Sequence, residues 1–366
     1  MSSYNFYDSI SREKYTPDVN QWKPKVGLFN MEPYPVDFPM ENIIKRQASM
    51  WRYEEALPIH KKEPTISLGE GMTPLIVLDD KNPHFLVKMD YLMPTGSFKD
   101  RGAAMLMAKA KEMGAQSVIA DSSGNAGTSI AAYCARANIE CHVYTPSSTS
   151  EKKLAQIKAH GAQLHLIPGT REQTAVAAKE AVEKEGIFYA SHVYNPYFYE
   201  GTKTFAFEIW EQLHYTAPDT LILPVGNGTL LLGAYIGFND LKRAGAIQKM
   251  PKIIGVQSEH CAPIEKAYRE NISVSSVDNK GTKAEGIAIG YPPRGDQIIE
   301  AVKHTNGTII IAPENQIETA GKDLANKGFY VEPTTAATYA AYRNYEQNIA
   351  KTETVVMPLC GSGLKK

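Results

Sequence analysis

Short apolar segments alternate with helical segments along most of the chain from residue 84 onward. Each apolar segment is five or six residues long and contains β-branched or bulky side chains, which is typical of strands buried on both faces of a parallel sheet. Alternation of such strands with helices indicates βαβ units. The predicted strands cover residues 84–89, 117–121, 141–145, 163–167, 220–225, 252–257, 308–312 and 354–359.

Helices are predicted between these strands, among them residues 102–113, 128–137 and 230–241. The pattern therefore predicts an α/β protein with two open twisted mainly parallel sheets flanked by helices. The first 62 residues are different, because they are rich in proline, tyrosine and charge. We expect an extended arm there, interrupted by a helix over residues 40–53 and anchored by Trp22 and Trp51.

The composition limits the partners of this protein. The 366 residues include 39 basic and 40 acidic side chains, so no net field attracts nucleic acid or an anionic membrane. No apolar window approaches the roughly 18 residues of a membrane span, and the N-terminus lacks the apolar core of a secretory signal. Four cysteines without a CxxC spacing indicate neither a disulfide framework nor a zinc site. We expect a cytoplasmic protein with a small polar substrate and no metal.

The residues around Lys99 are unusual for a surface lysine. Thr95, Gly96 and Ser97 suit a tight turn and a helix N-cap. Asp100 complements the positive start of a helix. An ammonium group beside a helix N-terminus tends to lose its proton, and a neutral lysine amine can attack a carbonyl to form a Schiff base. Lys99 is therefore the candidate catalytic residue.

Two loops that join a predicted strand to a predicted helix suit an anion. Residues 226–229 read Gly-Asn-Gly-Thr, and residues 122–127 read Ser-Ser-Gly-Asn-Ala-Gly. At both places backbone N–H groups at the start of a helix can point at a negative group, with the helix dipole behind them. A simple turn, or a capping loop without a ligand, would give the same local pattern.

An ordered set of motifs resembles the pyridoxal-phosphate enzymes of fold type II, the tryptophan synthase β superfamily, and most closely the threonine synthases. The resemblance covers most of the chain from Met50 onward. Its motifs are residues 51–53, 67–75, 94–102, 122–127, 195–196, 200–201, 226–229, 331–333 and 361–365.

The resemblance implies an active site in the cleft between a large and a small domain. Residues 1–95 and 191–366 would form the large cofactor-binding domain with its N-terminal arm. Residues 96–190 would form the small mobile α/β domain. The resemblance also implies a homodimer with a small amino-acid substrate.

The resemblance gives each candidate site residue a role. Lys99 would hold pyridoxal 5′-phosphate and then take the Cα proton as general base. Residues 226–229 would hold the cofactor phosphate, Asn125 its ring hydroxyl, and Cys360 would face the ring nitrogen. The implied cofactor-binding residues are Phe98, Lys99, Asn125, Gly226, Asn227, Gly228, Thr229, Glu285, Gly286 and Cys360. The implied substrate-binding residues are Ser122, Ser123, Gly124, Ala126 and Phe198.

Four positions depart from the threonine synthase pattern. Cys360 replaces a threonine. A thiol is a weak hydrogen-bond donor, so it would leave the nitrogen of the cofactor ring largely neutral. The alternative interpretation of Cys360 is a small buried side chain with no role in the site. Phe198 replaces an arginine, while Val193 and Ala126 replace hydroxyl-bearing residues. An arginine-phosphate pair is a strong contact, so its loss disfavours a phosphorylated substrate.

These departures predict a lyase similar to serine and threonine dehydratases. It would act on a small unphosphorylated L-amino acid by β-elimination or replacement through an aminoacrylate. Two alternatives remain open. One is a threonine synthase that converts O-phosphohomoserine to threonine, and the other is a catalytically silent protein that binds pyridoxal phosphate.

Overall fold

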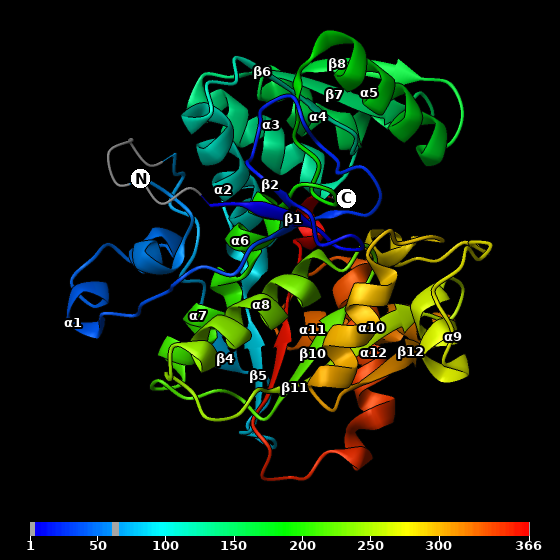
Figure 1. The fold of residues 1–366 in the computed structure, drawn as a ribbon. Helices are drawn as coiled ribbons and strands as arrows, with labels where there is room; N and C mark the ends of the chain where they lie inside the picture. The colour runs from blue at the N-terminus through cyan, green and yellow to red at the C-terminus, as the bar shows by residue number, and fades with distance from the viewer. Residues whose placement is uncertain (1–3, 61–65, 366) are drawn as a thin grey trace. The chain divides into compact units, whose positions relative to one another are not determined.

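The computed structural model describes residues 4–60 and 66–365, and the chain folds into two compact units (Figure 1). The first unit consists of Met1–Glu70 and Lys99–Thr202, and the second of Gly71–Phe98 and Lys203–Lys366. These units begin and end at residues other than those of the predicted domains, and the mobility of residues 96–190 stays a prediction.

A four-stranded parallel sheet forms the centre of the first unit, with the strand order β8-β7-β6-β9. Helices α3 and α4 connect β6 to β7 and β7 to β8, whereas α5 returns in the opposite direction to β9. Because βαβ crossovers are right-handed, α3 and α4 cover one face of the sheet and α5 covers the other (Figure 1). The bounds are β6 Ser117–Ala120, α3 Asn125–Ala137, β7 Glu140–Pro146, α4 Glu151–Ala159, β8 Gln163–Ile167, α5 Arg171–Glu185 and β9 Phe188–Tyr189.

Helix α2 (Lys99–Glu112) packs against α3 and against α6 (Pro196–Thr202) in the same unit. Glycines allow α2 and α6 to approach closely. A Cβ atom on Gly201 would lie 2.0 Å from the carbonyl oxygen of Arg101, and a Cβ atom on Gly102 would lie 2.3 Å from the ring of Phe198. Neither position has room for a side chain unless the helices separate.

The N-terminal segment contains a small sheet that the sequence pattern did not predict. Strands β1 (Phe6–Asp8), β2 (Lys14–Tyr15) and β3 (Phe29–Met31) pair antiparallel in the order β2-β1-β3. Phe6 lies in the core of the first unit, with its ring centroid 5.1 Å from that of Tyr197. The arm is therefore attached by buried aromatic rings.

The predicted continuous helix over residues 40–53 is wrong. The structure has α1 (Met40–Ile43) and a separate 3-10 helix η1 (Met50–Ala56). Ser49 separates them in an extended conformation, with φ −153° and ψ 170°. The guanidinium group of Arg52 donates hydrogen bonds of 2.7 and 3.1 Å to the carbonyl oxygen of Ile43. This side chain therefore binds a carbonyl group at the end of α1 that another helical turn would otherwise bind.

A six-stranded sheet forms the centre of the second unit, with the order β12-β11-β10-β13-β5-β4. All neighbouring pairs are parallel except β4 with β5. The predicted α/β class with mainly parallel sheets is thus confirmed. The strand bounds are β4 Leu75–Val77, β5 Phe85–Lys88, β10 Thr220–Pro224, β11 Lys252–Ser258, β12 Thr308–Ala312 and β13 Val355–Pro358.

Helices cover both faces of this sheet (Figure 1). Helices α8 and α10 lie on the crossovers from β10 to β11 and from β11 to β12, and α11 and α12 lie on the return to β13. Right-handed crossovers in opposite directions place these two pairs on opposite faces. The helix bounds are α7 Thr204–Gln212, α8 Thr229–Arg243, α9 Pro263–Glu270, α10 Gly295–His304, α11 Ile317–Asn326 and α12 Pro333–Tyr345.

A buried ion pair joins β5 to α7 in the second unit. The Nζ atom of Lys88 lies 2.7 Å from Oε2 of Glu208, and both side chains are 0% exposed. The same ammonium group donates to the carbonyl oxygen of Thr73 at 2.6 Å and to Oε1 of Gln212 at 2.9 Å. This charge thus contacts one carboxylate and two neutral acceptors.

None of the helices in the described part of the chain combines the length and the apolar composition needed to cross a membrane.

Candidate active site

Lys99 is the first residue of α2 in the first unit. The next residue, Asp100, is fully buried, and its carboxylate accepts a 2.6 Å hydrogen bond from the hydroxyl of Ser129 on α3. This contact fixes the start of α2 beside the start of α3. The Nζ atom of Lys99 lies 5.7 Å from the ring centroid of Phe198, within the range of a cation-π contact.

The loop from Ser122 to Gly124 connects β6 to α3, and Asn125 and Ala126 open the helix. A Cβ atom on Gly127 would lie 1.7 Å from the carbonyl oxygen of Ser122, so the loop folds back onto the first turn of α3. The residues at positions 122–125 are partly or fully exposed, while Ala126 is buried. The first N–H groups of a helix have no partner within the helix, so this loop presents them to a carboxylate.

Phe198 is completely buried on α6, with its ring packed against Gly102 of α2. Val193 and Ala126 are also buried. The position that corresponds to an arginine in the threonine synthase pattern therefore holds an apolar ring beside Lys99.

His192 is a neighbour of Lys99 that sequence reasoning missed. Its ring meets that of Phe198 edge to face, with the centroids 6.0 Å apart. Burial, and then the positive charge of Lys99, lower the pKa of His192 well below its ordinary value. The imidazole is therefore neutral at neutral pH. In the sequence, His192 has no acidic residue or cysteine at a spacing typical of a catalytic or metal site. The signal that could have pointed to it is the Asn195-Pro196 motif, which begins three residues later.

In the second unit, residues 226–229 form the connection from β10 to α8. Gly226 is buried, and Gly228 has a left-handed conformation with φ +76° that favours glycine. A Cβ atom on Gly228 would also lie 2.3 Å from the side chain of Ile298. Thr229 is 3% exposed and opens the 15-residue helix α8. The loop therefore lies at the carboxyl end of a central strand, at the positive end of a long helix.

Glu285 and Gly286 lie on the 3-10 helix η3 (Glu285–Ile287), which packs directly against this loop. A Cβ atom on Gly226 would lie 2.8 Å from the carbonyl oxygen of Gly286. On its other side, Gly286 approaches the side chain of Thr334 at the start of α12. The structure thus brings together two predicted cofactor-binding segments that lie about 60 residues apart in the sequence.

Cys360 follows β13, the strand that pairs with β10, and its side chain is fully buried. The backbone N–H of Cys360 donates to the hydroxyl of Thr335 at 3.0 Å. Its carbonyl oxygen accepts a 3.0 Å hydrogen bond from the N–H of Phe98. Phe98, which precedes Lys99 in the chain, is therefore fixed to the end of β13 within the second unit.

The residues of each unit fit pyridoxal phosphate. In the second unit the 226–229 loop lies at the N-terminus of α8, where the first N–H groups of a helix have no partner within the helix and can bind a phosphate. The hydroxyl of Ser97, two residues before Lys99, is buried and has no hydrogen-bond partner among the described residues. A buried hydroxyl without a partner is unfavourable, and a polar ligand would supply one. The role of each residue stays a prediction.

Comparison with known proteins agrees with this chemistry. A family described as "Pyridoxal-phosphate dependent enzyme" matches residues 66–361. Threonine synthase from Methanocaldococcus jannaschii is 34% identical over 335 residues, covering 89% of this chain and 82% of that protein. Threonine synthase from Bacillus sp. (strain ULM1) is 37% identical over 322 residues, covering 86% of this chain and 89% of that protein.

Solved structures show the same fold at lower identity. Threonine deaminase isoform 2 from Solanum lycopersicum superposes with a TM-score of 0.72 at 23% identity, covering 93% of this chain and 90% of that one. Serine racemase from Dictyostelium discoideum has a TM-score of 0.68 at 24% identity, covering 80% and 92%. The predicted family, fold type and cofactor are confirmed: the chain belongs to the pyridoxal-phosphate-dependent enzymes of fold type II.

Proposed function

We propose that this protein is a pyridoxal-phosphate-dependent lyase that acts on a small unphosphorylated L-amino acid. The reaction would be β-elimination of a side-chain group, or its replacement by a nucleophile. Bound pyridoxal phosphate withdraws electrons from the substrate Cα and so makes its proton acidic. The protein must then hold the cofactor, orient the carboxylate of the substrate and accept the proton.

Lys99 is assigned two of these tasks in the proposal. Its Nζ atom would hold the cofactor and would also act as the general base that accepts the proton from Cα. The N–H groups at the start of α3 bind the substrate carboxylate. The proposed cofactor-binding residues are Phe98, Lys99, Asn125, Gly226, Asn227, Gly228, Thr229, Glu285, Gly286 and Cys360, and the proposed substrate-binding residues are Ser122, Ser123, Gly124, Ala126 and Phe198.

The observation that carries the choice of substrate is the burial of Phe198. The ring is 0% exposed, packs on Gly102 and lies 5.7 Å from the Nζ atom of Lys99. A buried apolar ring offers no donor to a phosphate, and the desolvation of a doubly charged group beside it is unfavourable. A hydroxyl-bearing or acyl-bearing side chain of modest size is compatible with such a surface.

Threonine synthase is the second candidate, because curated relatives with that name are 34% and 37% identical to this chain. Steady-state assays with serine, threonine, O-acetylserine and O-phosphohomoserine separate the two candidates. We expect keto acid and ammonia, or a replacement product, from at least one unphosphorylated amino acid. Turnover of O-phosphohomoserine alone would refute the proposed substrate class.

The role of Lys99 is tested by reduction of the purified protein with borohydride. Wild-type protein should show a visible absorption band of bound cofactor, and reduction should attach the cofactor covalently at Lys99, as peptide mass spectrometry would show. Lys99→Ala should lose this attachment and the lyase activity. Lys111→Ala is a matched control, because Lys111 is an exposed lysine near the end of the same helix. Unchanged attachment in Lys99→Ala would refute the assignment, and absence of turnover with intact attachment would indicate a silent binder.

Three further features belong to the proposal. The protein would work in the cytoplasm, which is consistent with cysteines that are all buried and free. It would form a homodimer, as light scattering of the purified protein can test. Residues 1–95 and 191–366 would act as the cofactor-binding domain and residues 96–190 as a mobile domain, which hydrogen exchange with and without substrate can test.

A further inference from the structure

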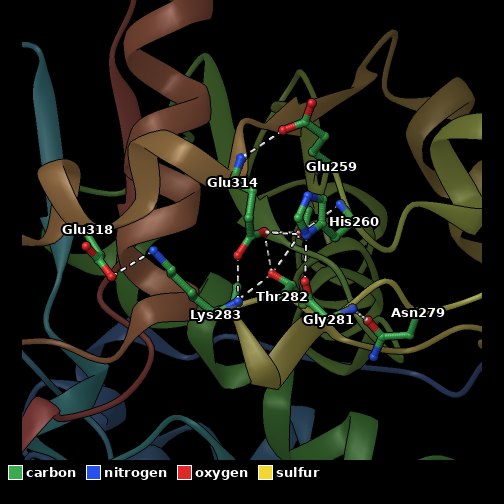
Figure 2. A network of polar contacts seen from close by, with 10 residues as sticks. Glu259, His260, Asn279, Gly281, Thr282, Lys283, Glu314 and Glu318 are labelled. Carbon is green, nitrogen blue, oxygen red and sulfur yellow. Dashed lines mark hydrogen bonds and ion pairs between the residues drawn. The ribbon is translucent and has the colours of Figure 1, made fainter.

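A network of polar contacts lies at the carboxyl ends of β11 and β12 in the second unit (Figure 2). Glu314, the second residue after β12, is its centre. Its Oε2 atom accepts hydrogen bonds from the hydroxyls of Thr282 at 2.7 Å and Ser258 at 2.9 Å. Its Oε1 atom accepts a 2.6 Å hydrogen bond from the backbone N–H of Lys283. The Glu314 residue is 9% exposed, so these contacts are largely shielded from water.

His260 adds a second attachment to the same loop. Its Nδ1 atom lies 2.6 Å from the carbonyl oxygen of Gly281, so this nitrogen carries the proton. The carbonyl oxygen of His260 in turn accepts a 3.1 Å hydrogen bond from the N–H of Lys280. Residues 280–283 are thus fixed to the ends of two strands of the sheet.

The charge of Glu314 is maintained within this network. Burial raises the pKa of the carboxyl group, but the hydrogen bonds from Lys283, Thr282 and Ser258 outweigh burial and hold the pKa below its ordinary value. His260 contributes in the same direction, with Nδ1 4.0 Å from Oε2. An ionised carboxylate that accepts several hydrogen bonds forms strong and directional contacts.

The fixed loop leads directly into η3, the 3-10 helix that contacts the 226–229 loop. Ala284 is fully buried, and its N–H donates to the hydroxyl of Thr282 at 3.1 Å. Two residues later, Gly286 lies against Gly226, where a Cβ atom would be 2.8 Å from the Gly286 carbonyl oxygen. A contact as close as this transmits a displacement of one loop to the other.

We propose that Glu314 is a positioning residue for the cofactor phosphate: it holds residues 280–283 so that η3 supports the 226–229 loop in its binding conformation. The proposal rests on the proposed function of that loop. Glu314 itself contacts neither cofactor nor substrate in this assignment. Its effect passes from the carboxylate through Thr282 and Ala284 to Gly286.

The test compares two forms of the cofactor on the purified full-length protein after removal of bound cofactor. Dissociation constants of pyridoxal phosphate and of pyridoxal, which lacks the phosphate, are measured by absorbance or fluorescence titration for wild type and Glu314→Gln. The substitution keeps the shape but removes the charge. Glu318→Gln is the matched control, because Glu318 is an exposed glutamate that also contacts Lys283, through an ion pair of 2.7 Å with the side-chain Nζ atom and not through the backbone.

We expect Glu314→Gln to weaken pyridoxal phosphate binding about 10- to 100-fold, the loss typical of hydrogen bonds to a buried charge. Pyridoxal binding should change by less than about threefold, and Glu318→Gln should match wild type for both compounds. An equal loss for pyridoxal and pyridoxal phosphate would overturn the proposal, because it would indicate a general structural defect. Unchanged binding of both compounds would overturn it as well.

A second variant covers the case in which Glu314→Gln does not fold. Thr282→Val removes one hydroxyl donor and leaves the Glu314 carboxylate with its hydrogen bonds from Ser258 and the backbone of Lys283, so the same selective loss is expected at smaller size. Far-UV circular dichroism of each apoprotein establishes that the variants are folded. If wild type itself binds pyridoxal and pyridoxal phosphate equally well, the proposed phosphate loop is wrong. If wild type binds pyridoxal phosphate more tightly than pyridoxal, and the variants show the same preference, only the role of Glu314 is wrong.

Discussion

The buried ion pair between Lys88 and Glu208 permits a quantitative prediction. Both side chains are 0% exposed and their charged atoms lie 2.7 Å apart, so each charge stabilises the other at close range. In Glu208→Leu the ammonium group of Lys88 retains the carbonyl of Thr73 and the amide oxygen of Gln212, both neutral. Removal of one partner from a buried ion pair costs about 3–5 kcal/mol, and we expect the free energy of unfolding to fall by that amount.

A double-mutant cycle separates this cost from the loss of packing. Lys88→Met should destabilise the protein about as much as Glu208→Leu, because it breaks the same buried ion pair by removing the other partner. The double variant removes both charges and should lie within about 2 kcal/mol of wild type. Each protein is saturated with pyridoxal phosphate and unfolded in guanidinium chloride, since ligand binding also contributes to stability. Additive effects of the two substitutions, or a loss below about 1 kcal/mol in Glu208→Leu, would refute the reasoning.

Two further predictions concern the loops around the proposed site. Gly226→Ala should weaken pyridoxal phosphate binding at least tenfold, because its Cβ atom would lie 2.8 Å from the Gly286 carbonyl oxygen. The control is Gly321→Ala on α11, where the new Cβ atom would lie 3.4 Å from that of Ala336. This variant should bind pyridoxal phosphate as wild type does in the same titration. The lowered pKa of His192, caused by burial and by the charge of Lys99, means that only the unfolded chain takes up this proton below about pH 6.5. Stability should therefore decrease as the pH falls below about 6.5, by up to about 1.4 kcal/mol per pH unit from this group. Urea unfolding between pH 7 and 5 should show a smaller decrease for His192→Asn, and identical slopes would contradict the prediction.

Most strands were predictable because parallel strands buried on both faces are continuous apolar runs. The predicted segments 220–225 and 252–257 match the buried strands β10 and β11 to within one residue at their C-terminal ends. The short strands β1, β2 and β3 have two or three residues each, too few for a recognisable period. The order of strands was also outside the reach of a local pattern, because β13, near the end of the chain, pairs with both β10 and β5.

The candidate site was predictable to the extent that its residues lie in strand-loop-helix motifs. The structure explains why Gly226 and Gly286 are glycines, since their backbones are in contact within the second unit. Glu314 and His260 had no signal in the sequence, because their partners are backbone groups and hydroxyls of a loop more than 20 residues away from either. Contacts of this kind depend on the tertiary arrangement of β11 and β12 and leave no local spacing.

The packing of Phe198 on Gly102 has a consequence for how the substrate range of this protein can evolve. The ring occupies the space that any side chain at position 102 would need, and α2 and α6 touch again at Gly201. A change from Phe198 to arginine would place a charge in a cavity shaped for a flat ring, and a compensating change at Gly102 would clash before that substitution had occurred. Neither single step is favourable by itself. A path toward an arginine at position 198 would therefore begin with a loss of packing between α2 and α6, and this favours the persistence of the apolar surface beside Lys99.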